Sequence, residues 1–255
     1  MKKILFSLIA LSAITFNACN NSNSGTAQNE VVNFYDVPLV CGAAPHIGCG
    51  SKAKPILLGL EKKNDVVKEA WLNREGTVIA IVWNENVSAE LKTKTSDAIF
   101  KENKMDVTLL SENEHRKMLI DFEQKKNWYR GAEVDKLSME EAAIIAERLV
   151  KRINAKTPLT KEKSGVLQQA ITNNFKTTFK AINSTLNINT DEKKAMETYK
   201  QKFETEILEI GKKYLNETEM IALKDAIANG LTPTEDENKE LKSCEKKNKD
   251  KCCKK

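Results

Sequence analysis

The chain has 255 residues, of which 40% are hydrophobic, 30% charged and 6% aromatic, and its formal net charge is +5. This composition is typical of a soluble globular protein and excludes collagen-like, mucin-like and polytopic membrane proteins. At ~100–200 residues per domain the length allows one or two domains, and the charge surplus is too small to indicate a nucleic-acid partner by itself.

Residues 1–18 have the pattern of an export signal. Two lysines precede an apolar run over residues 4–16, which is too short to cross a ~30 Å hydrocarbon core as a helix. The junction of Ala18 and Cys19 resembles the cleavage box of bacterial lipoproteins, in which the cysteine becomes the lipidated first residue. The resemblance implies a lipid anchor at Cys19, a flexible tether over 19–30, and a bacterial membrane location facing the periplasm. Ordinary signal cleavage that leaves Cys19 free is the alternative.

Residues 31–111 predict a small α+β domain. Short apolar segments rich in β-branched residues alternate with two amphipathic helices in the order β-α-β-β-α-β, the ferredoxin-like arrangement. The predicted strands cover 37–40, 66–72, 77–83 and 105–110, and the predicted helices start near Pro55 and Ser88. Segment 77–83 is almost continuously apolar and β-branched, so we expect it to be a central strand.

This layout, with a Gly-rich loop before the first helix, resembles the heavy-metal-associated domains of copper and mercury carriers over about a third of the chain. Cys49 stands where that family has its first metal-binding cysteine, and Lys52 stands at the place of the second. Met105 lies near the family's loop aromatic residue, close to the metal. The resemblance implies a metal site beside Cys49 and Met105.

A second cysteine lies on the other side of the loop. Cys41 and Cys49 enclose seven residues that include glycines, a proline and His46, so the loop can fold back and bring the sulfurs together. Two thiolates and an imidazole suit Cu(I), Hg(II) or, with an added ligand, Zn(II). Two interpretations stay open beside metal binding. One is a structural or partner-binding lipoprotein in which Cys41 and Cys49 form a stabilising disulfide, and the other, least favoured, is a redox-active thiol pair.

Residues 112–230 predict an all-α bundle, which offers a surface for an envelope protein partner. Capping boxes start helices at Ser111, Ser138 and Asn216, and His115 is expected on the surface. This half contains no Ser/His/Asp set, no phosphate loop and no paired carboxylates on an apolar face, so we do not expect an enzyme.

Residues 231–255 lack apolar periodicity and are expected to be disordered. From Lys239 onward there are eight lysines and three acidic residues, so the positive surplus lies in this tail and the folded part offers no nucleic-acid surface. Three tail cysteines are candidate ligands for a soft metal, namely Cys244, Cys252 and Cys253. A solvated tail with incidental thiols, or a tail lying on an anionic membrane surface, is the alternative.

Overall fold

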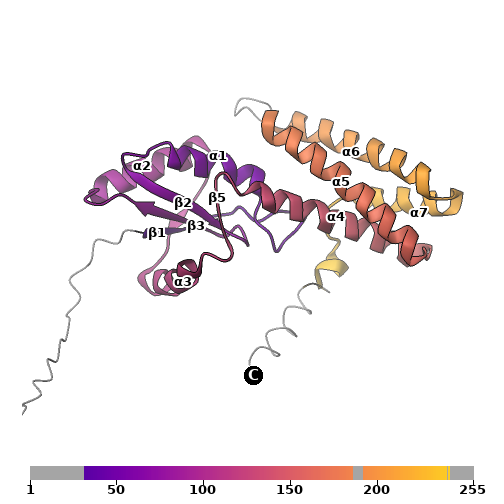
Figure 1. Cartoon of the computed structure of the whole chain (residues 1–255), viewed down its shortest axis with the longest axis horizontal. Coiled ribbons are helices and arrows are strands. Elements are labelled where there is room, and N and C mark those ends of the chain that lie inside the picture. The colour runs from indigo at the N-terminus through magenta and orange to yellow at the C-terminus, as the bar shows by residue number, and fades with distance from the viewer. Residues whose placement is uncertain (1–31, 186–191, 240, 242–255) are drawn as a thin grey trace, which may run out of the picture. The chain divides into compact units, whose positions relative to one another are not determined.

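The computed structural model describes residues 32–185, 192–239 and 241, without the side chains of 181–185 and 192–197 (Figure 1). These residues form a mixed α+β protein with a small antiparallel sheet and several long helices, which confirms the predicted α+β class. They belong to one compact unit whose first residue is Val31.

The sheet has five strands in the described part of the chain. They are β1 (Val32–Asp36), β2 (Val67–Asn73), β3 (Val78–Trp83), β4 (Thr108–Leu109) and β5 (Trp128–Arg130). Their order is β4-β1-β3-β2-β5, and each neighbouring pair is antiparallel. All six residues of β3 are buried, because strands pair with both of its edges and other elements cover both of its faces. The prediction of a central strand here is confirmed. The predicted first strand at 37–40 is wrong, since β1 covers the preceding residues, and β4 is shorter than the predicted 105–110.

Helices cover both faces of the sheet. Figure 1 shows α1 (Gly50–Glu61) and α2 (Ala89–Glu102) on one side and α3 (Glu112–Gln124) on the other. Successive side chains of a strand point to opposite faces, so β3 supplies both layers. Ile79, Ile81 and Trp83 join the core under α1 and α2, whereas Val78, Ala80 and Val82 pack with Phe122 and Trp128. Helix α1 starts at Gly50, five residues before the predicted start at Pro55.

The layered part of the protein extends beyond residue 111. Both α3 and β5 follow that residue, yet both pack against the sheet, so the predicted boundary between 111 and 112 falls inside the layered part. The expectation of a surface position for His115 is wrong, since this side chain is only 8% exposed. Its Nε2 lies 3.0 Å from the carbonyl oxygen of Val32, and its ring meets Phe34 edge-on at 5.0 Å. The cause is that α3 lies against the sheet and does not begin a separate bundle.

Four helices follow: α4 (Asp135–Lys156), α5 (Lys161–Thr185), α6 (Glu192–Tyr214) and α7 (Glu217–Ala228). They enclose a second core, to which α4 contributes Ile145 and Leu149, while Leu137 at its start belongs to the first core. Capping boxes are confirmed at Ser111 and Asn216. Ser138 is instead a buried residue inside α4, which begins at Asp135. Within the described residues we find no helix with the length and apolar composition needed to cross a bilayer.

The segment after α7 is ordered for longer than predicted. The backbone N–H of Thr234 donates to Glu237 at 2.8 Å, and residues 235–239 are helical. Arg152 of α4 binds the Glu237 carboxylate with Nε and Nη2 at 2.9 and 2.8 Å and also donates to carbonyls at the end of α7. The expectation of disorder from residue 231 is therefore wrong up to residue 239, because a shielded guanidinium binds this segment.

Candidate functional site

The loop between β1 and α1 folds into a short hairpin that brings the two cysteines together. Val40 and Gly48 form an antiparallel bridge. On either side of it, the N–H of Cys41 donates to the carbonyl of Ile47 at 2.8 Å and the N–H of Cys49 donates to that of Leu39 at 2.6 Å. Since residues 41 and 49 each lie one step from the bridge, their side chains are on the same face of the hairpin.

A close contact between two glycines fixes the hairpin on the sheet. Gly76, in the turn between β2 and β3, has a positive φ of 74°, and a Cβ added there would lie 2.4 Å from the Cα of Gly48. The N–H of Gly48 also donates to the carbonyl of Arg74 at 2.7 Å. Only glycines allow this approach of two backbones, so the cysteine loop is held rigidly against the β2–β3 turn.

Cys49 is the accessible thiol of the pair. It is half-buried and directly precedes the first residue of α1, and its Sγ lies 3.3 Å from the hydroxyl oxygen of Ser51. Sulfur in this position faces the positive end of a helix, where negative charge is favoured.

Cys41 is only 5% exposed and contacts α4. Its thiol donates a hydrogen bond to the Glu141 carboxylate, and its sulfur lies within electrostatic range of Cys49. Burial first, and the Glu141 charge second, raise the pKa of the Cys41 thiol to about 12. Burial also raises the pKa of Glu141. Without a bound metal ion, Cys41 is therefore a protonated thiol that faces the carboxyl group of Glu141.

Arg148 ties the cysteine loop to α4 and to the segment after α7. This side chain is buried, and its Nη1 donates to the carbonyl of Ala43 at 2.7 Å and to that of Leu231 at 2.6 Å. Burial lowers the pKa of the guanidinium, and the neighbouring Glu237 and Cys41 oppose that shift. One cation thus joins three segments that are far apart in the sequence.

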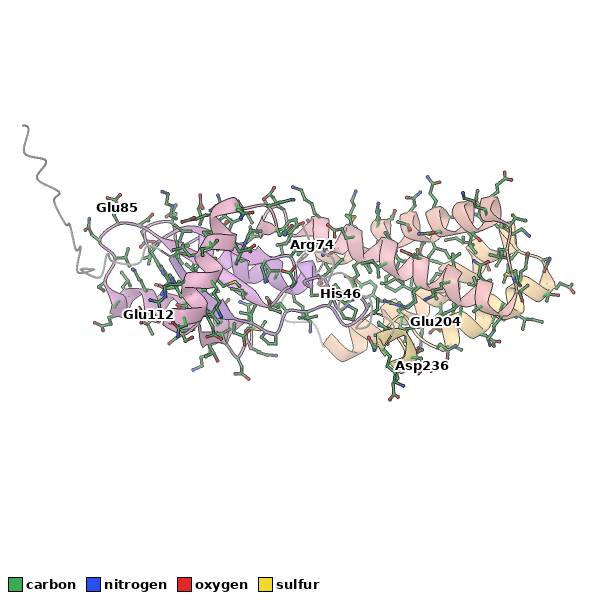
Figure 2. The ribbon with its side chains drawn as sticks, turned by 90° about the horizontal axis from the view of Figure 1, so that it is seen from below. His46, Arg74, Glu85, Glu112, Glu204 and Asp236 are labelled. Atoms are coloured by element: carbon green, nitrogen blue, oxygen red, sulfur yellow. The ribbon has the colours of Figure 1, made fainter. Side chains whose placement is uncertain are left out.

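The predicted ligands are brought together only in part. Both Cys41 and Cys49 are free thiols, so the disulfide expected as an alternative is not present. His46 is half-buried, and its carbonyl oxygen accepts from Arg74 at 3.4 Å; Figure 2 shows these two residues close together. Within the described ranges no three or more His, Cys, Asp or Glu side chains are grouped to hold a metal ion. A three-ligand arrangement of His46 with both cysteines is therefore absent from this conformation.

The other predicted site residues lie elsewhere. Met105 is half-buried between α2 and β4, where it packs against the first core. The predicted lipidation site and the predicted tail ligands lie outside the described residues; these are Cys19, Cys244, Cys252 and Cys253.

Sequence reasoning missed Glu141, Arg148 and Arg152 of α4. Their spacing of seven and four residues puts them on one face of a helix. That face also borders buried positions such as Leu149. Charged side chains at core-facing spacing were the signal that these residues have partners in other segments.

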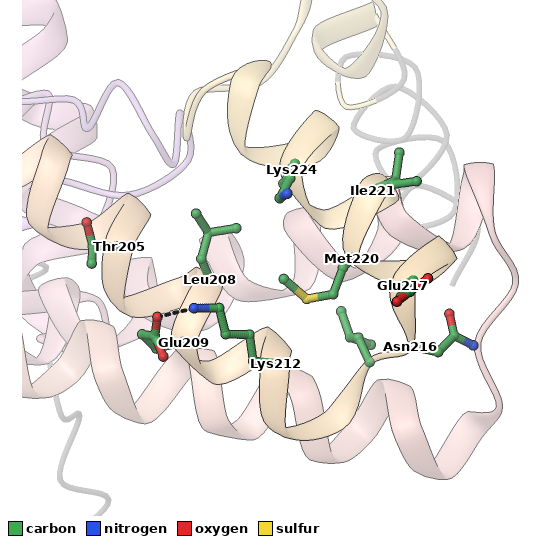
Figure 3. Close-up of a pocket in the computed structure, with 10 residues that line it drawn as sticks. Thr205, Leu208, Glu209, Lys212, Asn216, Glu217, Met220, Ile221 and Lys224 are labelled. Carbon is green, nitrogen blue, oxygen red and sulfur yellow. Dashed lines mark hydrogen bonds and ion pairs between the residues drawn. The ribbon is translucent and has the colours of Figure 1, made fainter.

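Apart from the cysteine loop, a cavity of about 660 Å³ lies between α6 and α7 (Figure 3). Leu208, Met220 and Ile221 line it, and Ile221 is 62% exposed. On its rim Lys212 donates to Glu209 at 2.6 Å. Glu217 and Lys224 also line this cavity, and among the described residues no group of three or more metal-ligating side chains is found here.

No family model matches the chain, and no curated protein or solved structure matches it either. Function is therefore inferred from the chemistry of the cysteine loop.

Proposed function

We propose that this chain is a lipid-anchored lipoprotein of the bacterial envelope that binds a soft metal ion through Cys41 and Cys49, for sequestration or transfer. The single observation that carries the proposal is that two free thiols share one face of a rigid hairpin at the head of α1. Cu(I) and Hg(II) accept two thiolates without further ligands. Zn(II) needs four ligands, so it requires groups beyond this pair.

The arrangement of β1 to β4 supports the resemblance to heavy-metal-associated domains. The order β4-β1-β3-β2 with helices after β1 and β3 is what a ferredoxin-like βαββαβ unit requires, and β5 is an added edge strand. In this assignment the hairpin lies between the first strand and the first helix. The lipid anchor is proposed from the Ala18–Cys19 junction alone.

The chemistry of binding follows from the state of the two thiols. A metal ion that binds Cys41 must displace the proton of a shielded thiol, and Glu141 is its hydrogen-bond partner. Cys49 supplies the accessible sulfur at which the ion first binds. Because thiolate ligation releases protons, affinity should fall as the pH is lowered.

A structural role is the second candidate, and the burial of Cys41 favours it. In this reading the Cys41 thiol is a packing group that binds the loop to α4 through Glu141. The loop then stabilises a lipoprotein whose helical part binds an envelope protein.

The test isolates the loop from the tail. We would purify residues 31–255 under reducing, oxygen-free conditions with Cys244, Cys252 and Cys253 replaced by serine, and titrate Cu(I) against a chromophoric chelator. We expect one Cu(I) per chain, and none after Cys41→Ser and Cys49→Ser are added. If the chain with both loop cysteines replaced bound as much copper as the chain that keeps them, the proposal would be refuted and the structural role favoured. His46→Gln is the matched control within the same loop, and it should leave the stoichiometry at one.

A further inference from the structure

We infer that the cavity between α6 and α7 is an interface at which two copies of this chain form a symmetric dimer, with their α7 helices antiparallel. The inference is independent of metal binding at the cysteine loop. Two features of the cavity carry it, namely an apolar centre that is open to water and a charge pattern along α7 that is complementary to itself.

The first feature is an apolar face on the outer side of α7. The inner side of this helix joins the second core through Ala222, Leu223, Ala226 and Ile227. On the outer side Ile221 is 62% exposed and Met220 is half-buried, and both line the cavity together with Leu208 of α6 (Figure 3). Burial of contiguous apolar surface favours association, and such surface around a groove is typical of an interaction site.

The two walls of the cavity are held close together at Gly211. A Cβ added to this residue of α6 would lie 2.3 Å from Cδ2 of Leu223 and 2.9 Å from the sulfur of Met220. Only residues 215 and 216 connect α6 to α7, so the helices are antiparallel neighbours. A partner therefore meets a preformed groove, and binding to a preformed surface costs less ordering entropy.

The second feature is the order of charges along α7. Four residues of this helix line the cavity, namely Glu217, Met220, Ile221 and Lys224. Their spacing of i, i+3, i+4 and i+7 is that of one helix face. When a second α7 lies antiparallel on the first, a two-fold axis between residues 220 and 221 places Glu217 opposite Lys224 of the second copy, and the reverse pair follows by symmetry. The apolar residues then meet at the centre.

Both charged residues are available for these contacts. Glu217 and Lys224 are exposed, and within the part of the chain that the structure describes neither forms an ion pair, since the ion pairs of α7 go to α4 and α5. On the opposite wall Lys212 donates to Glu209, so these two charges compensate each other. A parallel arrangement would place like charges side by side, which opposes association. The charge pattern therefore favours a second copy in the antiparallel orientation.

The size of the interface indicates a weak dimer. Helix α7 has 12 residues and is therefore about 18 Å long at ~1.5 Å per residue. Stable interfaces bury about 1,200–2,000 Å² in total, and smaller ones belong to transient complexes. We therefore expect a reversible dimer with a dissociation constant in the range of about 10 μM to about 1 mM.

The experiment follows the molar mass of residues 31–255 by sedimentation equilibrium in reducing buffer, from about 1 to about 500 μM. The reference carries serine in place of Cys244, Cys252 and Cys253, so that no tail disulfide links two chains. Ile221→Asp should weaken dimerisation by about 10-fold or more, because a charge then lies at the apolar centre. The matched control is Ile120→Asp on α3, where Ile120 is 67% exposed, and it should dimerise as the reference does. A reference that stays monomeric throughout, or equal losses in both variants, would overturn the inference.

Charge reversal tests the antiparallel orientation. Glu217→Lys and Lys224→Glu each leave like charges on both sides of every contact, so each variant alone should dimerise about 10–100-fold more weakly than the reference. An equimolar mixture of the two should dimerise about as tightly as the reference, because each contact then joins opposite charges. This rescue also shows that both variants are folded. Weak association of the mixture, or reference-like association of either variant alone, would contradict the proposed dimer.

Discussion

Replacing Glu237 by Gln should destabilise the protein at neutral pH and leave it unaffected at low pH. The two hydrogen bonds from Arg152 are the main cause that lowers the pKa of Glu237 from its ordinary 4.5 to about 2. A fully shielded carboxyl group with this pKa shift would contribute about 3 kcal/mol to the free energy of unfolding at neutral pH. Because the Glu237 side chain is 21% exposed, we expect about 1–2 kcal/mol.

The sign follows from linkage. A carboxyl group with a depressed pKa in the folded state stabilises the fold above its unfolded pKa, and this contribution is lost as the pH falls from about 4.5 to about 2. Glutamine cannot take up that proton. The difference between wild type and Glu237→Gln should therefore close over this interval.

Urea unfolding of residues 31–255, followed by tryptophan fluorescence at pH 7, 5, 3 and 2, measures the effect. The matched control is Asp236→Asn on the same short helix, where Asp236 is 92% exposed and pairs with Lys239. We expect the control to change stability by less than about 0.5 kcal/mol. A Glu237→Gln variant as stable as wild type at pH 7, or one whose deficit persists at pH 2, would refute the reasoning.

Three other substitutions test the packing, each by urea unfolding at pH 7. Gly50→Ala should destabilise by about 1–3 kcal/mol, because a Cβ there would lie 2.3 Å from the carbonyl oxygen of Val134. Gly165→Ala in α5 meets open space and should stabilise by about 0.5–1 kcal/mol; a loss would show that Gly165 has an unrecognised partner. His115→Ala should cost about 2 kcal/mol through lost packing on Phe34, and a neutral effect would mean that α3 does not depend on this contact.

Local patterns in the sequence predicted most of the elements. The β-branched run of 77–83 identified the central strand, and the capping boxes at Ser111 and Asn216 located two helix starts. The capping pattern misled at Ser138, because the same residue types also occur inside a helix when their side chains find other partners. Ser138 is buried at the point where Gly50 of α1 comes close to α4. This contact depends on tertiary structure.

What could not be predicted depended on contacts between distant segments. The short strand β5 forms because Tyr129 pairs with Leu72, and three residues are too few to show a strand period. His115 is buried because α3 lies on Phe34, and nothing local to α3 specifies that partner. In both cases the contact joins segments that are distant in the sequence, so no local pattern could predict it.

The same distinction between local and long-range contacts holds for the candidate site. The hairpin that joins Cys41 and Cys49 follows from the glycines of its loop, and sequence reasoning identified the pair. Glu141 and Arg148 contact the loop from positions about a hundred residues further along the chain. The sequence of the loop therefore could not predict them as its partners. Their signal lay in α4, where their spacing matches that of the core positions.

Arg148 contacts both the cysteine loop and the segment that follows α7. A ligand that moves the hairpin changes the contact between Ala43 and Arg148, and the same guanidinium holds Leu231. Coupling between two binding sites is reciprocal, so a partner whose binding at Leu231 weakened this contact and the affinity of the loop would itself bind more weakly, by the same factor, when the loop is occupied.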